Sequence, residues 1–381
     1  MNETFLPFAK PSISEAAIQE VVDCLRSGWI TTGPRTQRFE ALLQEYLGAP
    51  KVLACSSATA GLFMALSSLN LQPGDEVITT AMTFVATLNT IVQAGGRPVL
   101  VDVEPHTYNM DMAQLERAIS PKTKAIVPVH FAGLPVDLDP LYALAKKHHL
   151  RVIEDAAHAI GTVYKGKKIG SFGDTQVFSF HPNKNMTTIE GGCIALQDES
   201  LVQHCKLLRF HGIDRDSWNR FSKEGKQDYD VVMPGYKFNF TDVQAALGIH
   251  QLAALDSFIE KRTALVSRYY EALAVSRLLA LPQAPAYEHR HAWHLFAPRL
   301  RPECGLSRET FMEKLKAANI GTGLHYNPPH LYSYYQKTFG YTEGSFPIAE
   351  AVGSQIVSLP LFPDMTVQDQ DRVIQAIEAI C

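Results

Sequence analysis

Short apolar runs rich in β-branched residues recur between residues 51 and 196, separated by polar or glycine-containing turns. Runs of this kind are typical of strands buried on both faces. The segments between them, such as 58–70 and 139–149, carry apolar residues at the 3.6-residue period of a helix. The runs are KVLACSS at 51–57, EVITT at 76–80, RPVLVDV at 97–103, KAIVPVHF at 124–131, RVIED at 151–155, TQVFSF at 175–180 and GCIAL at 192–196. Alternating strands and helices predict an α/β fold with a mostly parallel sheet that helices cover on both faces.

The pattern changes after Thr241. A long helical stretch at 241–274 is followed by a proline-containing segment at 281–292. The remainder mixes apolar runs at 293–300, 321–326 and 355–360, which predict strands, with helical patterns at 307–318 and 367–380. We therefore predict a large domain over residues 13–250 and a small C-terminal α+β domain over 251–381, with the N-terminal segment 1–12 packed nearby.

Composition and charge exclude several classes of protein. The 381 residues include 35 Lys and Arg against 39 Asp and Glu, a formal net charge of −4, which does not supply the basic surface of a nucleic-acid binder. The chain has no basic start followed by an apolar run, and no apolar stretch long enough to span a bilayer. Its six cysteines include no CxxC pair, so neither a disulfide scaffold nor a zinc ribbon is indicated. We expect a cytoplasmic protein without a nucleic-acid or membrane partner and without a metal.

Lys184 and Asp155 are the strongest candidates for chemistry. Lys184 lies in a Pro, Asn, Thr and Gly-containing loop after the run that ends at Phe180; a lysine in such a loop is usually solvated. Asp155 ends the buried RVIED run at the carboxyl edge of the predicted sheet, where a lone carboxylate is costly without a cationic partner, although it could also cap the turn that follows. Pyridoxal phosphate requires both a lysine for its aldehyde and an acid that keeps its ring nitrogen protonated. One cofactor thus accounts for both residues.

The same cofactor needs a phosphate site and a stacking partner. The LACSSATAGL segment is a hydroxyl-rich turn that opens a helix, whose free N–H groups and positive end suit an anion. Ser or Thr at a helix start is, however, usually only a cap, and a buried aromatic is usually core. The candidates are Ser57, Ala58, Thr59 and Ala60 at that turn, Ser179 near the end of the 175–180 run, and Phe84 as the stacking ring.

Several long motifs resemble those of the DegT/DnrJ/EryC1/StrS family of sugar-nucleotide aminotransferases, which are pyridoxal-phosphate enzymes of fold type I. The similarity runs nearly end to end: SGWITTGPRTQRFE at 27–40, SSATAGL, AMTFVATLNTI, IEDAAHAIG, FSFHPNKNMTTIEGG, GYKFNFTDVQAALG, GLHYNPPH and SLPLFPDMT. Within the family, AWHLFAPRL, CGLSRETFMEKLKAANIGTGLHY and SLPLFPDMT look most like segments of the UDP-4-amino-4-deoxy-L-arabinose aminotransferases of lipid A modification.

The resemblance assigns roles to individual residues. It implies that Lys184 is the catalytic residue that holds the cofactor aldehyde and that Asp155 pairs with the pyridine nitrogen. It further implies that Phe84 stacks on the ring, that His158 lies beside it, and that Thr59, Ala60 and Ser179 bind phosphate. The residues matching the nucleotide-sugar cleft are Gly28, Trp29, Ile30 and Thr31 together with His325 and Tyr326.

Two positions depart from the family pattern. Lys237 stands where many members carry an Asn that reaches the phosphate of the partner subunit, and Asn239 lies two residues further on, so either one is a candidate for that contact. Ile189 stands where Gly or Ala is frequent. Because the GYKFNF segment crosses the subunit interface in the family, the resemblance implies a homodimer with shared active sites.

The implied reaction moves the amino group of glutamate onto a nucleotide-linked 4-keto sugar, with a UDP-4-keto-pentose favoured. Alternative acceptors are a UDP-2-acetamido-4-keto-6-deoxy sugar, a dTDP-4-keto-6-deoxyhexose or a free keto sugar acid. Two other classes remain: a non-catalytic relative that binds a sugar nucleotide, suggested by Ile189, and a metal enzyme that uses His289, His291 and His294.

Overall fold

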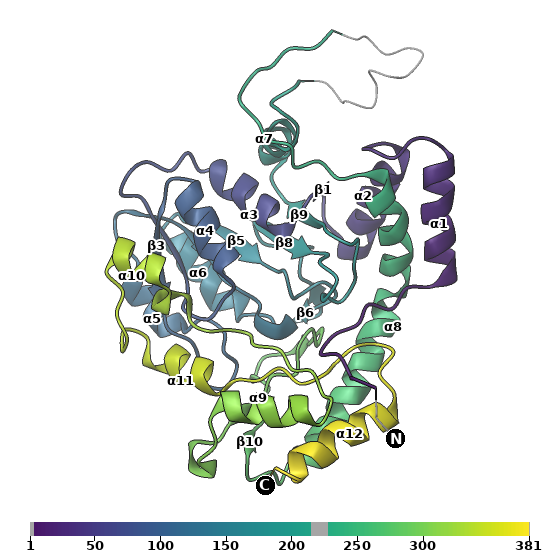
Figure 1. Ribbon diagram of the computed structural model, residues 1–381. Helices are drawn as coiled ribbons and strands as arrows, with labels where there is room; N and C mark the ends of the chain where they lie inside the picture. The colour runs from purple at the N-terminus through teal and green to yellow at the C-terminus, as the bar shows by residue number, and fades with distance from the viewer. Residues whose placement is uncertain (1–3, 215–227, 381) are drawn as a thin grey trace.

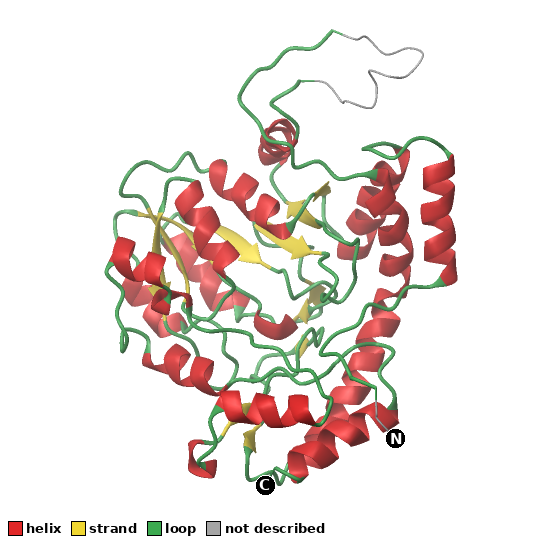
Figure 2. Cartoon of the chain, in the orientation of Figure 1, coloured by secondary structure: helices red, strands yellow, loops and turns green. Residues whose placement is uncertain are grey.

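The computed structural model describes residues 4–214 and 228–380, and its centre is a seven-stranded sheet (Figure 1, Figure 2). The strand order is β1-β9-β8-β5-β4-β2-β3. Its strands are β1 (Lys51–Cys55), β2 (Glu76–Thr80), β3 (Arg97–Val101), β4 (Thr123–Val127), β5 (Arg151–Asp155), β8 (Thr175–Ser179) and β9 (Gly192–Leu196). Within this sheet β9 alone runs against the other strands, because it pairs antiparallel with both β1 and β8 while the remaining pairs are parallel. The predicted mostly parallel sheet is confirmed.

Helices cover both faces of this sheet. The helices are α1 (Glu15–Arg26), α2 (Pro34–Leu47), α3 (Ala58–Ser67), α4 (Val85–Gln93), α5 (Met112–Ala118), α6 (Leu138–Lys147), α7 (Glu199–Arg209), α8 (Asp242–Leu273), α9 (Arg308–Ala317), α10 (Ser333–Phe339), α11 (Pro347–Gln355) and α12 (Val367–Glu378). Short strands form two small sheets: β6 (Val163–Tyr164), β7 (Lys167–Lys168) and β11 (His289–Arg290) in one, β10 (Leu279–Ala280) and β12 (Arg299–Leu300) in the other.

Alternate side chains of each strand enter opposite cores, as the period of two requires. Val52 and Ala54 of β1 join a core with α2, α5, α6 and the first half of α8, whereas Leu53 and Cys55 join a core with α3, α4 and α7. Helix and strand meet closely on the second face, since a Cβ on Gly61 of α3 would lie 2.7 Å from a methyl of Val177. This contact fixes the start of α3 against the sheet.

A third core gathers below the sheet in Figure 1 from the second half of α8, α9, α12 and the N-terminal segment, in which Leu6 is buried. The helix α8 is continuous from Asp242 to Leu273 and contributes to this core as well as to one core of the sheet. The helix therefore passes unbroken through residue 250, where the sequence predicts the boundary between the two domains. That boundary stays a prediction.

The three strands predicted at 293–300, 321–326 and 355–360 are wrong as continuous elements. These segments meet mainly through isolated bridges, such as Gly323 with Ser358 and Phe296 with Leu359, and only Arg299–Leu300 forms a regular strand. A backbone φ of 47° at Trp293 turns the chain out of the extended conformation, and a proline at 298 has no N–H for a ladder. Within residues 4–214 and 228–380, no helix combines the length and apolar character needed to cross a membrane.

Candidate active site

A cavity of about 870 Å³ opens at the carboxyl ends of the parallel strands, where ligands of open α/β sheets bind. Chain segments that follow β1, β2, β5 and β8 form most of its wall, and a segment before α10 closes one side. The lining includes Ser57, Ala58, Thr59, Thr83, Phe84, Asn89, Asp155, Ala157, His158, Ser179, His181, Asn183, Lys184, Glu190, Gly191, His325, Tyr326, Asn327, Tyr332, Tyr334 and Tyr335.

Asp155 and Lys184 face this cavity from neighbouring strands. Asp155 ends β5, which pairs in parallel with β8, and Lys184 lies in the turn after β8. The Asp155 carboxyl is 6% exposed and accepts hydrogen bonds from the Thr87 hydroxyl (2.8 Å) and the Ala157 N–H (3.2 Å). Burial raises the pKa of Asp155. Burial lowers the pKa of Lys184 to about 8, although the charge of Asp155 acts in the opposite direction.

The start of α3 forms an anion site beside this pair. Ser57 caps the helix by accepting a hydrogen bond from the Ala60 N–H (3.1 Å), which leaves the N–H groups of Ala58 and Thr59 at the cavity with no acceptor in the helix. Gly192 allows the close approach, because a Cβ there would lie 2.6 Å from the Ala58 nitrogen. Free N–H groups at a helix start favour a phosphate.

These groups fit pyridoxal phosphate. The hydrogen-bond donors that reach Asp155 are both uncharged, so a protonated ring nitrogen would supply the cation that its burial demands. The lowered pKa of Lys184 brings its neutral amine, the form that attacks an aldehyde, into the physiological range. Phe84 precedes α4 with its ring 55% exposed and 5.9 Å from the ring of Tyr326, so an aromatic face is available at the cavity.

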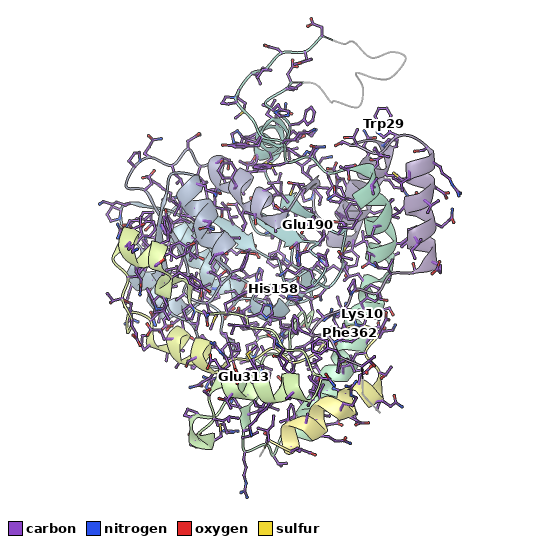
Figure 3. The ribbon with its side chains drawn as sticks, viewed as in Figure 1. Lys10, Trp29, His158, Glu190, Glu313 and Phe362 are labelled. Carbon is purple, nitrogen blue, oxygen red and sulfur yellow. The ribbon has the colours of Figure 1, made fainter. Side chains whose placement is uncertain are left out.

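A cluster of rings forms the wall towards the C-terminal part of the chain. The His158 ring lies 4.3 Å from His294 and 6.1 Å from Tyr326, centroid to centroid. His158 Nε2 is 3.0 Å from the Tyr326 hydroxyl, and His325 Nδ1 is 2.9 Å from the Ser358 hydroxyl. In Figure 3, His158 lies between the central sheet and the C-terminal elements, below Glu190.

Other residues predicted for the site lie outside this cavity in the single chain. Gly28, Trp29, Ile30 and Thr31 form the connection between α1 and α2, which Figure 3 shows near the α1–α2 end of the molecule, away from His158. Asn239 donates to the Thr32 hydroxyl (2.8 Å), and both residues border a second, polar groove of about 610 Å³.

Lys237 and Ala60 also stay out of the cavity. The Lys237 amine lies 4.1 Å from the centre of the Phe210 ring. Ala60 is buried, and Ser57 already accepts its N–H. The structure thus brings together the predicted residues Ser57, Ala58, Thr59, Phe84, Asp155, His158, Ser179, Lys184, His325 and Tyr326, but not the other predicted site residues.

Sequence reasoning missed several groups at the cavity or next to it. Thr87, which is buried and donates to Asp155, is one, and its signal was available, because Thr83 and Thr87 lie four residues apart and their hydroxyls are 2.8 Å from each other. The tyrosines at 332, 334 and 335 are others, and the aromatic LYSYYQ run that contains them is visible in the sequence.

The histidine cluster and Ile189 each have a structural setting. His291 stacks on Trp293 with ring centroids 3.7 Å apart, and His294 packs on His158. Within the described ranges, no group of three or more His, Cys, Asp or Glu residues is arranged to hold a metal ion. Ile189 has a φ of 72°, which explains why glycine suits this position.

Comparison with known proteins adds independent information. Residues 11–378 match the profile of the DegT/DnrJ/EryC1/StrS aminotransferase family. The chain is 45% identical over 381 residues to the uncharacterized protein MJ1066 of Methanocaldococcus jannaschii, covering all of this chain and 98% of that protein. It is 44% identical over 378 residues to the spore coat polysaccharide biosynthesis protein SpsC of Bacillus subtilis, covering 99% and 97%.

Among solved structures, the putative sugar aminotransferase Spr1654 of Streptococcus pneumoniae superposes with a TM-score of 0.91 and 36% identity. The match to its PMP form covers 98% of both chains. The same protein is also known in a PLP form, which superposes equally well.

Proposed function

Because this chain belongs to the DegT/DnrJ/EryC1/StrS aminotransferase family and is a pyridoxal-phosphate-dependent sugar aminotransferase, we propose that it moves the amino group of glutamate onto a nucleotide-linked keto sugar. One observation carries the assignment of its residues. Lys184, Asp155 and the open start of α3 meet in a single cavity at the carboxyl edge of the sheet. An amine, a buried acid and an anion site are the three groups that the cofactor requires.

The cofactor supplies an electron sink that lowers the cost of removing a proton from the carbon bearing the amino group. Asp155 would keep the ring nitrogen protonated, since an anion at 6% exposure favours a cation next to it. The phosphate would be bound by Ser57, Ala58, Thr59 and Ser179, and Phe84 would cover the ring.

Lys184 has two roles. Its amine would hold the cofactor, and in its free form the same amine would take the proton from Cα of glutamate as a general base. A pKa of about 8 suits this second role, because a base works best when its pKa lies near the working pH. The same amine would return a proton to the sugar carbon in the second half of the reaction.

We further propose that the acceptor is a UDP-linked 4-keto pentose, on the similarity of three C-terminal segments given above. A cavity of about 870 Å³ exceeds the volume that the cofactor alone needs and leaves room for a sugar. His325 and Tyr326 contact that sugar. In the proposed homodimer the segment 28–31, which lies outside this cavity within a single chain, contacts its nucleotide. The protein works in the cytoplasm as a homodimer, in which the partner subunit's Lys237 or the partner subunit's Asn239 completes the phosphate site.

The lysine assignment is tested by reducing the holoenzyme with borohydride and mapping the modified peptide by mass. We expect the cofactor on Lys184, and we expect Lys184→Ala to lose the visible absorbance of the lysine-bound cofactor. Lys168→Ala is the matched control, because Lys168 is also partly buried with a lowered pKa yet lies outside the cavity. A label on another lysine would overturn the assignment.

The acceptor is tested with a panel of enzymatically generated keto sugar nucleotides, offered with glutamate and read by mass. The panel contains the UDP-4-keto-pentose, a UDP-2-acetamido-4-keto-6-deoxy sugar, a dTDP-4-keto-6-deoxyhexose and a free keto sugar acid. Fastest amination of the UDP-4-keto-pentose is expected. Amination of a different member would move the proposal to that sugar, and no amination of any member, with no 2-oxoglutarate from glutamate, would refute the activity of this site.

Shared sites are tested by mixing two inactive variants, Lys184→Ala and Lys237→Ala/Asn239→Ala, after reversible dissociation. A shared site predicts that activity returns in the mixture, because each hybrid dimer holds one site with an unmodified lysine and an unmodified phosphate contact. A mixture that stays inactive, or a fully active monomer at high dilution, would contradict the sharing.

A further inference from the structure

A chain of two hydrogen bonds fixes the proton positions behind the candidate active site. The backbone N–H of Ala132 lies 3.2 Å from His158 Nδ1. A backbone N–H can only donate, so Nδ1 must present its lone pair. The neutral imidazole of His158 therefore carries its proton on Nε2.

The second bond then has one direction. His158 Nε2 is 3.0 Å from the Tyr326 hydroxyl oxygen. Because the Nε2 proton lies between these two atoms, Nε2 donates the hydrogen bond and the Tyr326 oxygen accepts it. The phenolic proton must point elsewhere. His158 is the one hydrogen-bond partner of Tyr326 among the described residues, and Tyr326 lines the cavity, so its proton is available to whatever binds there.

The surroundings hold His158 in this state. His294 packs against this ring with centroids 4.3 Å apart and offers no competing bond, since neither of its ring nitrogens has a partner within the described part of the chain. Burial, reinforced by the positive charge of Lys184, lowers the pKa of His158 well below its ordinary value. Burial also raises the pKa of Tyr326, so the phenol keeps its proton.

We propose that Tyr326 is a one-way hydrogen-bond donor that binds an acceptor oxygen of the ligand, and that His158 is the residue that positions it. The oxygen belongs either to the ring hydroxyl of the cofactor or to the carbonyl of the keto sugar, since both are acceptors of the same kind. This inference rests on the proposed function and adds a specific hydrogen-bonding role to Tyr326 and an orienting role to His158.

Tyr326→Phe removes only the hydroxyl, and Tyr269→Phe is the matched control. Tyr269 is fully buried and donates to the Pro360 carbonyl (3.0 Å) in the C-terminal core, away from the cavity. If the oxygen is the cofactor's, Tyr326→Phe will weaken cofactor binding about ten- to a hundredfold without any sugar present, and will shift the pH at which the bound cofactor's visible absorbance titrates. The control will do neither.

If the oxygen is the sugar's, the cofactor spectrum and the reaction with glutamate will match the wild type. The reaction with the keto sugar will then slow about ten- to a hundredfold. A Tyr326→Phe enzyme that matches the wild type in cofactor binding, spectrum and both half-reactions would overturn the proposal. A wild type that converts no glutamate would instead overturn the proposed function, so the two failures are distinguishable.

The role of His158 is tested by a conservative pair of variants and by the wild type itself. Gln can offer an N–H near the position of Nε2, so His158→Gln should retain most of the cofactor binding or sugar turnover that His158→Leu loses; equal losses would refute the orienting role. Nitrogen-15 NMR of the wild-type histidines, assigned by the signal missing in His158→Gln, should show the Nε2–H form. An Nδ1–H or doubly protonated ring would overturn the argument without relying on any variant's stability.

Discussion

Asp155→Asn distinguishes the cost in folding stability of the buried carboxyl from its contribution to cofactor binding. The side chain of Asp155 accepts from Thr87 and from the Ala157 N–H, and both donors are neutral. An Asn of the same shape can still accept from Ala157, and its amide can donate to the Thr87 hydroxyl. The substitution therefore removes a poorly compensated charge without removing hydrogen bonds. We expect the cofactor-free variant to be more stable than the cofactor-free wild type at pH 7 by about 1–3 kcal/mol, the usual cost of burying an imperfectly solvated polar group.

The stability difference between Asp155→Asn and the wild type should depend on pH in a definite direction. Burial raises the folded-state pKa of Asp155 above its unfolded value of about 3.9. The wild type therefore loses stability as pH rises from the unfolded pKa through the folded pKa. The advantage of Asp155→Asn should be absent at about pH 3, grow over that interval and stay constant above it. Urea unfolding of the cofactor-free proteins, followed by circular dichroism at a series of pH values, measures the difference.

In the holoenzyme, Asp155→Asn should be harmful to cofactor binding and activity. Without the carboxylate, the cofactor's protonated ring nitrogen loses a charged partner, and we expect cofactor binding to weaken about tenfold or more and the glutamate reaction to slow by at least about a hundredfold. Glu154→Gln is the control, since the buried Glu154 accepts from Tyr142 and Gln176 and lies 2.8 Å from His130. An amide there cannot accept all these bonds, so that variant should lose stability. If Asp155→Asn destabilises the cofactor-free protein as Glu154→Gln does, the reasoning is refuted.

Two further substitutions test features outside the chemistry. Ile189→Gly should raise the free energy of unfolding by about 1 kcal/mol, because Ile189 is 57% exposed and has a φ of 72°. Urea unfolding measures the change. The control is Val367→Gly, at an exposed start of α12, which should lower the free energy of unfolding instead. Arg262→Leu should cost about 2–5 kcal/mol, since buried Arg262 donates to the carbonyls of Trp293, His294 and Leu361. An unchanged thermal midpoint for Arg262→Leu would contradict this.

The strands of the central sheet were predictable because their signal is local. Runs such as EVITT and RVIED are β-branched and apolar on both faces, and they form β2 and β5 with the predicted bounds. The C-terminal segments at 293–300, 321–326 and 355–360 carry a similar apolar signal, yet they pair mainly through isolated bridges. Their apolar side chains are buried by packing in two separate cores, one with α8, α9 and α12 and the other with α10 and α11, so burial there does not require a regular ladder.

The cavity was predictable only in part, for the same reason. Asp155 ends a strand and Lys184, Ser57 and Phe84 follow strands, and the topology of a parallel sheet brings such residues to one edge. Tyr335 reaches the cavity from another part of the chain, where its hydroxyl donates to Asn89 at a separation of 246 residues. A contact of that kind leaves no periodic trace in the sequence.

The sequence by itself determined the α/β class, the order of strands and helices, the family and the residues that suit pyridoxal phosphate, because each of these depends on side-chain type and local spacing. The tertiary structure decided which ring nitrogen of His158 carries a proton and in which direction the Tyr326 hydroxyl donates. The neutral state of His158 follows from one backbone N–H of Ala132, and the donor direction of Tyr326 follows from His158. Hydrogen-bond direction depends on which atoms meet across the fold, and residues 26 and 168 positions apart meet here only because the chain is folded.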